Sequence, residues 1–268
     1  MSGLSALFGR ELKKWFKQPF VLFISMIQPI IWMGLFGKAF NLSALVPSDL
    51  PPGMPSPFQT MFGTSDYFSY MAVGMLSFVV LFATMFSGMS IVWDRRLGFL
   101  NKVLSTPASR GSIVLSKVFM AVVRSLVQAG IVLGAAVVLG LRIGADFHPV
   151  YLLGVFAGLF LMSVGLSALF VAIAIRSTRW ETQMAVMNLL NLPLLFASNA
   201  LFPTSLMPDW LRAFSQVNPV TYGTDVARQL ILYTPDATAV VNDFLFLGAF
   251  AGIFAAIGIV LSWRYLSK

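Results

Sequence analysis

Long apolar runs, separated by short polar segments, dominate the sequence. A helix needs roughly 20 apolar residues to cross the hydrocarbon core of a bilayer, and six runs approach or exceed that length. We therefore predict an all-α integral membrane protein with six transmembrane helices. The predicted spans are residues 20–40, 67–91, 113–141, 150–175, 182–201 and 244–263.

The composition supports this membrane class. The chain has 268 residues, of which 58% are hydrophobic and only 10% are charged. These values lie outside the range of soluble globular domains and leave no room for a second, soluble domain. We therefore treat residues 1–268 as a single transmembrane domain. The net charge of +8 is better explained by contact with anionic membrane lipids than by nucleic-acid binding.

Residues 1–18 are predicted to form an amphipathic helix in the lipid headgroup layer. Apolar and basic side chains fall on opposite faces when each residue advances the helix by about 100°. The apolar face holds Leu4, Leu7, Phe8, Leu12, Trp15 and Phe16, and the basic face holds Arg10, Lys13, Lys14 and Lys17. Glu11 projects near the apolar face and breaks the pattern. It either pairs locally with Lys14 or forms a salt bridge to another cytoplasmic element, and both readings stay open.

Residues 93–110, WDRRLGFLNKVLSTPASR, form a patterned polar interruption between two spans. Asp94 is suited to cap a helix start, and Pro107 is suited to end the segment. The leucines and valine between them recur at helical spacing, so we expect a short amphipathic helix over residues 94–106. This segment is either a solvated basic loop or a docking element that a partner protein grips.

Basic residues predict the orientation of the chain. With the N-terminus inside, thirteen Lys and Arg residues fall in inner segments and four fall in outer segments, namely Lys38, Arg142, Arg212 and Arg228. This bias places both termini in the cytoplasm. Arg124 lies within the third predicted span, and we expect its side chain to reach back to the inner membrane interface.

The residues that enzymes and metal sites require are scarce. The chain has one histidine, His148, and no cysteine, which excludes a multi-histidine metal site and thiol catalysis. No phosphate-binding GxxxxGK[ST] loop, GxSxG elbow or pair of carboxylates occurs. We therefore expect no catalytic residue, no metal site and no cofactor bound by this chain.

Polar residues within spans are costly in lipid, so they usually face protein or water. In the fifth predicted span, Asn188, Asn191, Leu195 and Ser198 share one face, and in the second span Phe78, Phe82 and Met85 recur at similar spacing. These stripes either pack helices together or line a mostly apolar substrate pathway with a few polar anchors.

Three segments resemble the ABC type-2 permease family, in particular its drug-resistance (daunorubicin-resistance-like) branch. The inner loop carries Asp94-Arg95, Gly98, Leu104, Pro107 and Arg110. The outer segment FPTSLMPDWLRAFSQVNPVTYGTDVARQLI carries Phe-Pro, Pro-x-Trp-Leu, Asn-Pro and a later Arg, and the amphipathic N-terminal helix precedes the spans. The likeness covers nearly the whole chain. One departure is Asp94, where glutamate is commoner in the family.

This resemblance implies the permease subunit of an ATP-driven exporter for a hydrophobic or amphipathic drug or lipid-like substrate. Two such subunits, identical or related, would pair in the plasma membrane of a prokaryote. Two separate ABC ATPase subunits would dock beneath them and would hold the ATP and magnesium. Membrane lipids are further expected partners, and nucleic acid is not.

The resemblance also assigns roles to residues. The 94–106 helix would couple to the ATPase beside the N-terminal interface helix, and residues 203–228 would form re-entrant helices that close the exit. The implied coupling residues are Asp94, Arg95, Arg96, Leu97, Gly98, Leu100, Leu104, Pro107, Arg110, Glu11 and Glu181. The implied outer-gate residues are Phe202, Pro203, Pro208, Trp210, Asn218, Pro219 and Arg228.

Two other classes of function remain as alternatives. A membrane-embedded lipid-modifying enzyme would need a reactive cluster at the interface, and the sequence offers none. A regulatory or immunity membrane protein would not transport at all. Co-purification of an ATPase subunit separates the transporter from both.

Overall fold

Helices account for all the regular structure in the part of the chain that the computed structural model describes, which is residues 3–39, 57–64, 66–106 and 109–265. In order they are α1 (Gly3–Phe16), α2 (Pro19–Gly34), the π-helix η1 (Leu35–Ala39), α3 (Pro57–Phe62), α4 (Tyr67–Arg96), α5 (Phe99–Leu104), α6 (Arg110–Val138), α7 (Tyr151–Ala174), α8 (Trp180–Phe196), the 3-10 helix η3 (Thr204–Leu206), α9 (Asp209–Ser215), α10 (Pro219–Ile231) and α11 (Ala237–Tyr265).

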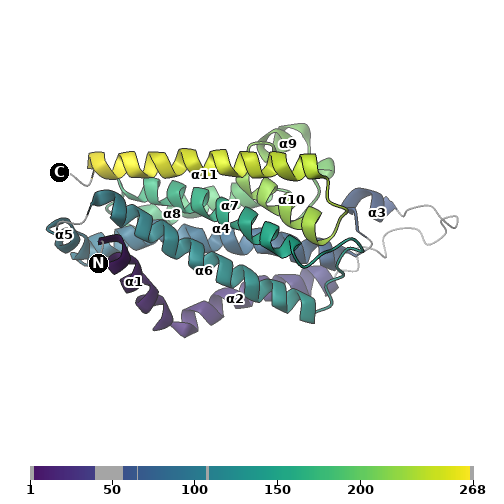
Figure 1. Cartoon of the computed structure of the whole chain (residues 1–268), viewed down its shortest axis with the longest axis horizontal. Coiled ribbons are helices and arrows are strands. Elements are labelled where there is room, and N and C mark those ends of the chain that lie inside the picture. The colour runs from purple at the N-terminus through teal and green to yellow at the C-terminus, as the bar shows by residue number, and fades with distance from the viewer. Residues whose placement is uncertain (1–2, 40–56, 65, 107–108, 266–268) are drawn as a thin grey trace.

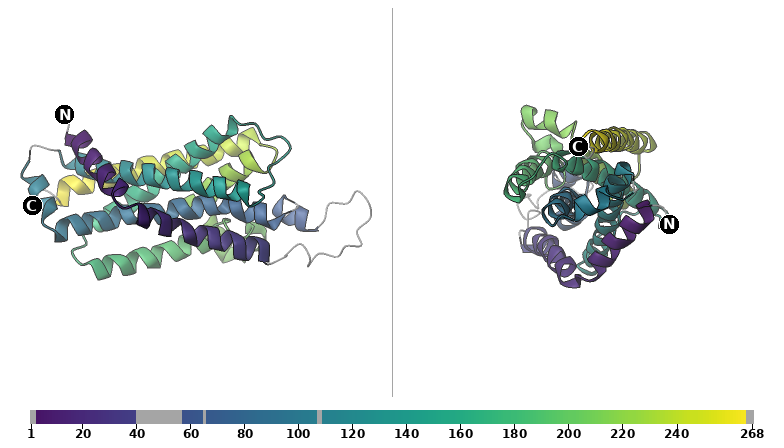
Figure 2. Two further views of the ribbon diagram at one scale, coloured as in Figure 1. Left: turned by 90° about the horizontal axis from the view of Figure 1, so that it is seen from below. Right: turned by 90° about the vertical axis from the view of Figure 1, so that its left-hand side faces the viewer.

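Helix α4 forms the centre of the bundle (Figure 2). It contacts α2, α6, α7, α8 and α10, and most of its side chains are buried. Glycine permits a close approach to α7, because a Cβ atom on Gly88 would lie 2.5 Å from the carbonyl oxygen of Phe170. Small residues at helix contacts are typical of membrane bundles, where close backbone packing replaces much of the hydrophobic driving force.

Among the described residues, four helices are long and apolar enough to cross a membrane, namely α4, α6, α7 and α11. The predicted all-helical membrane class is therefore confirmed for the described residues. Helices α2 and α8, with 16 and 17 residues, fall short of these four, and the six-span count stays a prediction.

Both of these shorter helices contain an internal proline. Pro29 lies inside α2 and Pro193 inside α8, and each removes a backbone hydrogen bond. Helix α2 continues for five more residues as η1, which lengthens the helical run without a break. At 1.5 Å per residue, α8 is about 26 Å long, slightly less than the hydrocarbon core of about 30 Å.

Several helix ends differ from the predicted ones. The fifth predicted span reaches residue 201, but α8 ends at Phe196, three residues after its internal proline. The last span begins earlier than residue 244, because Asp236 accepts a hydrogen bond from the amide of Thr238 at 2.9 Å and α11 begins at Ala237. Local capping therefore sets this boundary where hydropathy alone did not.

The bundle has two distinct ends (Figure 1). One end, which we call the α5 end, contains the first turns of α1, helix α5 and the last turns of α11. Helices α3 and α9 lie toward the other, which we call the α9 end. Residues far apart in the sequence therefore meet at each end, and the candidate sites lie there and in a cavity between them.

Candidate functional site

The structure divides the predicted 94–106 helix in two. Asp94 lies in the last turn of α4 and is 3% exposed, so it does not cap a helix start as the sequence suggested. The chain turns at Gly98, whose φ of 68° suits a residue without a side chain, and α5 begins at Phe99. The prediction failed because the Asp94 carboxylate binds other helices instead of the amides that follow it.

Those contacts form an ion-pair network between three helices, which we call the Lys117 network. It consists of Arg10, Glu11, Asp94 and Lys117. Lys117 Nζ in α6 lies 2.8 Å from Glu11 Oε1 in α1 and also donates to Asp94 Oδ2 in α4. Arg10 completes the network at 2.8 Å from Glu11 and 3.4 Å from Asp94. Of the two readings of Glu11, the salt bridge to another element is therefore confirmed.

Charge balance accounts for the stability of the network. Two carboxylates face two cations, and only Arg10 is appreciably exposed. Burial of charges is costly, and removing one partner of a buried pair leaves the other uncompensated. The positions of α1, the end of α4 and α6 are therefore linked by a set of contacts that is complete only when all three helices are in place.

Arg95 attaches the same turn to α7. Its guanidinium donates to the carbonyl oxygens of Ser177 and Ile175, the latter at 2.7 Å, just beyond the C-terminal end of α7. A cation at this position is favoured because carbonyl groups at a helix C-terminus lack helical partners and carry partial negative charge. Arg95 therefore binds within the chain and does not point outward.

The remaining predicted coupling residues separate into inward and outward groups. Leu100 is 4% exposed and packs with Val103, Ile113 and Leu7, so it faces the chain itself. Leu97 is 69% exposed. Arg96, Asn101 and Lys102 are also exposed, Leu104 and Arg110 are half-buried, and Glu181 is exposed in the first turn of α8. Pro107 lies outside the described residues. The outward face of this turn is thus small and centred on Leu97.

At the α9 end, Arg228 of α10 is almost completely buried, with 1% exposure. Its guanidinium donates to the carbonyl oxygens of Asn199 at 2.7 Å, Ala200 at 2.8 Å and Tyr70 at 3.2 Å. It also lies 3.4 Å from the centroid of the Tyr70 ring. The approach is possible because α4 has Gly74 there, where a Cβ atom would lie 2.0 Å from Ala200 O. Arg228 therefore joins α10, α4 and the turn after α8.

Asn218 makes a second junction at this end. Its side-chain oxygen accepts from the amide of Val220 at 3.0 Å and caps α10, and its Nδ2 donates to the carbonyls of Leu194 at 2.7 Å and Ala197 at 3.0 Å. One side chain thus satisfies the start of α10 and the end of α8 together. Among the other predicted outer residues, Pro203 and Pro219 are buried, whereas Phe202, Pro208 and Trp210 are exposed.

A half-buried tyrosine, Tyr233, links α3 to the turn that follows α10. The hydroxyl of Tyr233 donates to the carbonyl oxygen of Phe62 at 2.6 Å. Burial raises the pKa of Tyr233, so its hydroxyl keeps this proton at neutral pH. The contact fixes α3 against the turn between α10 and α11.

The predicted polar stripe on the fifth span does not act as one surface. Asn188 is exposed, whereas Asn191 is 1% exposed and its Nδ2 lies 2.9 Å from the sulfur of Met85. Leu195 is buried, and Ser198 lies beyond the end of α8 with its hydroxyl on the carbonyl of Leu195 at 2.6 Å. Asn191 and Met85 therefore meet between α8 and α4.

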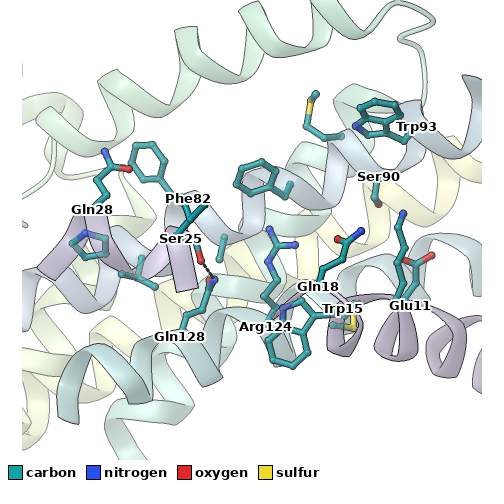
Figure 3. Close-up of a pocket in the computed structure, with 18 of the residues that line it drawn as sticks. Glu11, Trp15, Gln18, Ser25, Gln28, Phe82, Ser90, Trp93, Arg124 and Gln128 are labelled. Atoms are coloured by element: carbon teal, nitrogen blue, oxygen red, sulfur yellow. Dashed lines mark hydrogen bonds between the residues drawn. The ribbon is translucent and has the colours of Figure 1, made fainter. Parts of the chain in front are cut away.

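A cavity of about 480 Å³ lies among α1, α2, α4, α6 and Trp180 of α8 (Figure 3). Of the predicted pathway residues, Phe78 and Phe82 line it, whereas Met85 and the four stripe residues on or next to α8 do not. Arg124 also lines it, with its guanidinium 4.9 Å from the centroid of the Phe86 ring. The structure places Arg124 in this cavity wall, and the expectation that its side chain reaches the inner membrane interface stays a prediction.

Sequence reasoning missed the partners of the predicted acids. The sequence pattern shows Lys117 only as one of the inner basic residues and Arg10 only as part of a basic face. One signal was available, because Lys117 and Arg124 lie seven residues apart and therefore two turns apart on one face of an apolar helix. Two cations on one buried face indicate that each has a specific environment.

Comparisons with known proteins agree with this architecture. Residues 2–232 match the family model described as "ABC-2 type transporter". The chain is 32% identical to "Putative transport permease ycf38" of Cyanophora paradoxa over 80% of this chain and 69% of that protein. It is 28% identical to the protein of the same name from Pyropia yezoensis over 85% of this chain and 73% of that protein.

A more distant relative is the "Daunorubicin resistance ABC transporter permease protein DrrB1" of Streptomyces coeruleorubidus, at 23% identity over 63% of this chain and 59% of that protein. The family match covers most of the chain, including the Lys117 network, the contacts of Arg228 and residues 97–104, which we call the α5 turn. This multi-pass membrane protein belongs to the ABC-2 type transporter family and is similar to its transport and drug-resistance permeases.

Proposed function

We propose that this chain is the permease subunit of an ATP-driven exporter and that the turn around Leu97 contacts a separate ABC ATPase subunit. ATP and magnesium would be held by that ATPase, which fits a chain whose sequence has no phosphate-binding loop. The observation that carries the proposal is the position of this turn. Its outer face is exposed, while Asp94 and Arg95 attach its base to α1, α6 and α7.

This arrangement suits the transmission of motion. A partner that moves Leu97 also moves the last turn of α4, and the Lys117 network extends that displacement to α1 and α6. Because packed helices shift as units, such a displacement is passed along the bundle. The buried Leu100 serves a different purpose in this scheme, since it holds α5 against Leu7 and Ile113.

We also propose the finer features of the assembly. The α5 end faces the cytoplasm, both termini lie there, and α2 and α8 complete six spans in the plasma membrane of a prokaryote. Two permease subunits pair above two ATPase subunits, and the segment of η3, α9 and α10 closes the outer exit as re-entrant helices. Relatives named for drug resistance support a hydrophobic or amphipathic cargo moved outward.

The test compares two exposed leucines, one at each end of the molecule. Leu97 is 69% exposed at the α5 end and Leu206 is 48% exposed near α9. Each tagged variant, Leu97→Asp or Leu206→Asp, is purified from its native membrane, and ATPase subunits are identified by mass spectrometry and by ATP turnover. A carboxylate that must be buried at an apolar contact costs several kcal/mol, about the energy of a protein interaction hot spot.

We expect the unaltered chain and Leu206→Asp to retain an ABC ATPase, and Leu97→Asp to retain at least tenfold less while still inserting in the membrane. Equal retention by both variants would contradict the proposed contact. ATP turnover by the purified chain alone would contradict its role as a passive permease subunit. Absence of any ATPase from the unaltered chain would favour a regulatory protein or a lipid-modifying enzyme.

A further inference from the structure

The cavity beside α4 combines an apolar wall with a few polar groups. Phe78, Phe82 and Phe86 of α4 form much of the wall. Gln128 Nε2 donates to Ser25 Oγ at 2.7 Å on the facing side, so these two polar groups satisfy each other (Figure 3). Its volume of about 480 Å³ is within the range of roughly 300–1,000 Å³ that is common for small-molecule sites.

Arg124 is the exceptional residue in this wall. Its side chain projects into the cavity, between the Ser25–Gln128 pair and Gln18 in the view of Figure 3. In the described part of the chain no carboxylate lies within ion-pair distance of it, and its guanidinium lies over the face of the Phe86 ring. A cation within an apolar helix bundle is costly unless a counter-charge or water accompanies it.

The neighbouring acid does not supply that counter-charge. Glu11 also lines the cavity, but its carboxylate is held by Lys117 and Arg10 in a network with equal numbers of acids and bases. Lys14, the other charged lining residue, is basic. The cavity therefore carries an excess of positive charge beside an apolar surface.

The cavity extends from the α5 end toward the middle of the bundle. Lining residues of α4 run from Trp93 to Phe78, a rise of about 22 Å along the helix at 1.5 Å per residue. Trp15 and Lys14 of the amphipathic helix α1 also line the cavity, and the basic face of that helix attracts anionic amphiphiles at a membrane surface. A charged group and an alkyl chain of one molecule would thus find matching surroundings.

We propose that this cavity binds an amphiphilic anion, with its carboxylate or phosphate on Arg124 and its alkyl chain along Phe78, Phe82 and Phe86. The ligand enters from the membrane leaflet at the α5 end. A second, small cavity of about 50 Å³ reaches from Arg124 to Glu11 and Lys117, so the bound anion lies next to the Lys117 network. The role of the ligand as cargo rests on the proposed function, but its binding does not require the ATPase.

Tryptophan fluorescence provides the test, because Trp15, Trp93 and Trp180 line the cavity. The purified chain in phosphatidylcholine nanodiscs is titrated with 12-bromododecanoate, whose bromine quenches nearby indoles. The matched probe is 12-bromododecyltrimethylammonium, which has the same chain and the opposite charge. We expect saturable quenching by the anion and only non-saturable quenching, from partition into the lipid, by the cation.

Variants locate the site. Arg124→Gln removes the charge and is expected to weaken anion binding about tenfold, which corresponds to about 1.4 kcal/mol. Arg124→Lys keeps the charge and should restore most of the affinity. Arg142→Gln, at an exposed arginine toward the α9 end, is the matched control and should bind as the unaltered chain does.

Two results would overturn the proposal. One is unchanged anion affinity in an Arg124→Gln variant that melts at the same temperature as the unaltered chain. The other is saturable quenching by the cationic probe, a measurement on the unaltered chain that holds even if the variant does not fold. If the unaltered chain retains an ATPase but does not bind the anion, the proposed site is wrong and the proposed function stands. If the unaltered chain binds the anion but retains no ATPase, the site stands and the proposed function is wrong.

Discussion

The two ends of the bundle both bury a cation, but they neutralise it by different means. At the α5 end, Lys117 binds two carboxylates that come from two other helices. At the α9 end, Arg228 donates to the backbone carbonyls of Tyr70, Asn199 and Ala200. The first arrangement depends on charged side chains, and the second depends on backbone that is already fixed.

This difference indicates how each end responds to force. Ion pairs between side chains of separate helices can re-form after small shifts, since long side chains adjust their rotamers. A planar guanidinium held by several carbonyl groups tolerates much less displacement, because its donors point in fixed directions. We infer that the α5 end is suited to move with a partner, and that the α10 junction at the α9 end is suited to remain rigid.

The largest expected effect is that of Lys117→Met, which leaves Glu11 and Asp94 buried with Arg10 alone. Breaking a buried ion pair by removing one partner typically costs about 3–5 kcal/mol. The free energy of unfolding in detergent micelles, from denaturant titration, measures this loss. In the triple variant Glu11→Gln/Asp94→Asn/Lys117→Met the buried charges disappear together, so most of the stability should return. A triple variant as unstable as the single one would refute this electrostatic account.

The next effect separates the inward and outward faces of the α5 turn. Leu100→Ala should lower the free energy of unfolding by about 2–5 kcal/mol, because Leu100 is buried against Leu7 and Ile113. Leu97→Ala, at an exposed leucine three residues earlier, should change it by no more than about 0.5 kcal/mol. Similar losses from the two variants would show that the turn packs differently from the structure.

At the α9 end, Arg228→Lys should lower the free energy of unfolding by about 1.5–3 kcal/mol, the usual value for a hydrogen bond to a charged group. The ammonium keeps the charge but lacks the fork that reaches three carbonyls. Arg212→Lys is the control, since Arg212 is exposed. If Arg228→Lys proves as stable as the unaltered chain, the positive charge alone is sufficient at this position. The guanidinium hydrogen bonds would then not make the α9 end rigid.

The smallest effect is expected for Asn191→Leu. Asn191 donates only to the sulfur of Met85, a weak acceptor, and its side-chain oxygen has no partner among the described residues. Loss of one such hydrogen bond should cost about 1 kcal/mol or less. Thermal unfolding measures the cost, and an assay of ATP turnover against a panel of amphiphiles measures any change in cargo preference. A changed preference would support the predicted pathway role of Asn191, and an unchanged one would assign the residue to packing.

Local patterns in the sequence were sufficient for the helices and for some of their ends. Apolar runs predicted the long spans, and the predicted start of the second span at residue 67 is the first residue of α4. Asp94 shows the limit of this reasoning. The same residue type caps a helix start or binds a lysine in another helix, and only tertiary packing decides between them.

Contacts between distant residues set the rest of the candidate sites. Lys117 and Glu11 are 106 positions apart, and no periodicity within one helix pairs them. Asn188 and Asn191 share one helical face by spacing, yet one is exposed and the other is buried, because the boundary of the α4 contact passes between them. Spacing gives the face of a helix, but the neighbouring helices determine which part of that face is covered.

We predict that the Lys117 network makes α1 and the α5 turn move as one unit. Because the chain has no cysteine, spin labels can be placed on Lys13→Cys in α1 and Lys102→Cys in α5, both at exposed positions. Electron-resonance distances are then measured in the ATPase complex, with and without trapped ATP. We predict one narrow distance in both states, which broadens when Glu11, Asp94 and Lys117 are neutralised together. A distance that changes with ATP in the unaltered network, or that stays narrow after neutralisation, would show that the Lys117 network does not join the two elements.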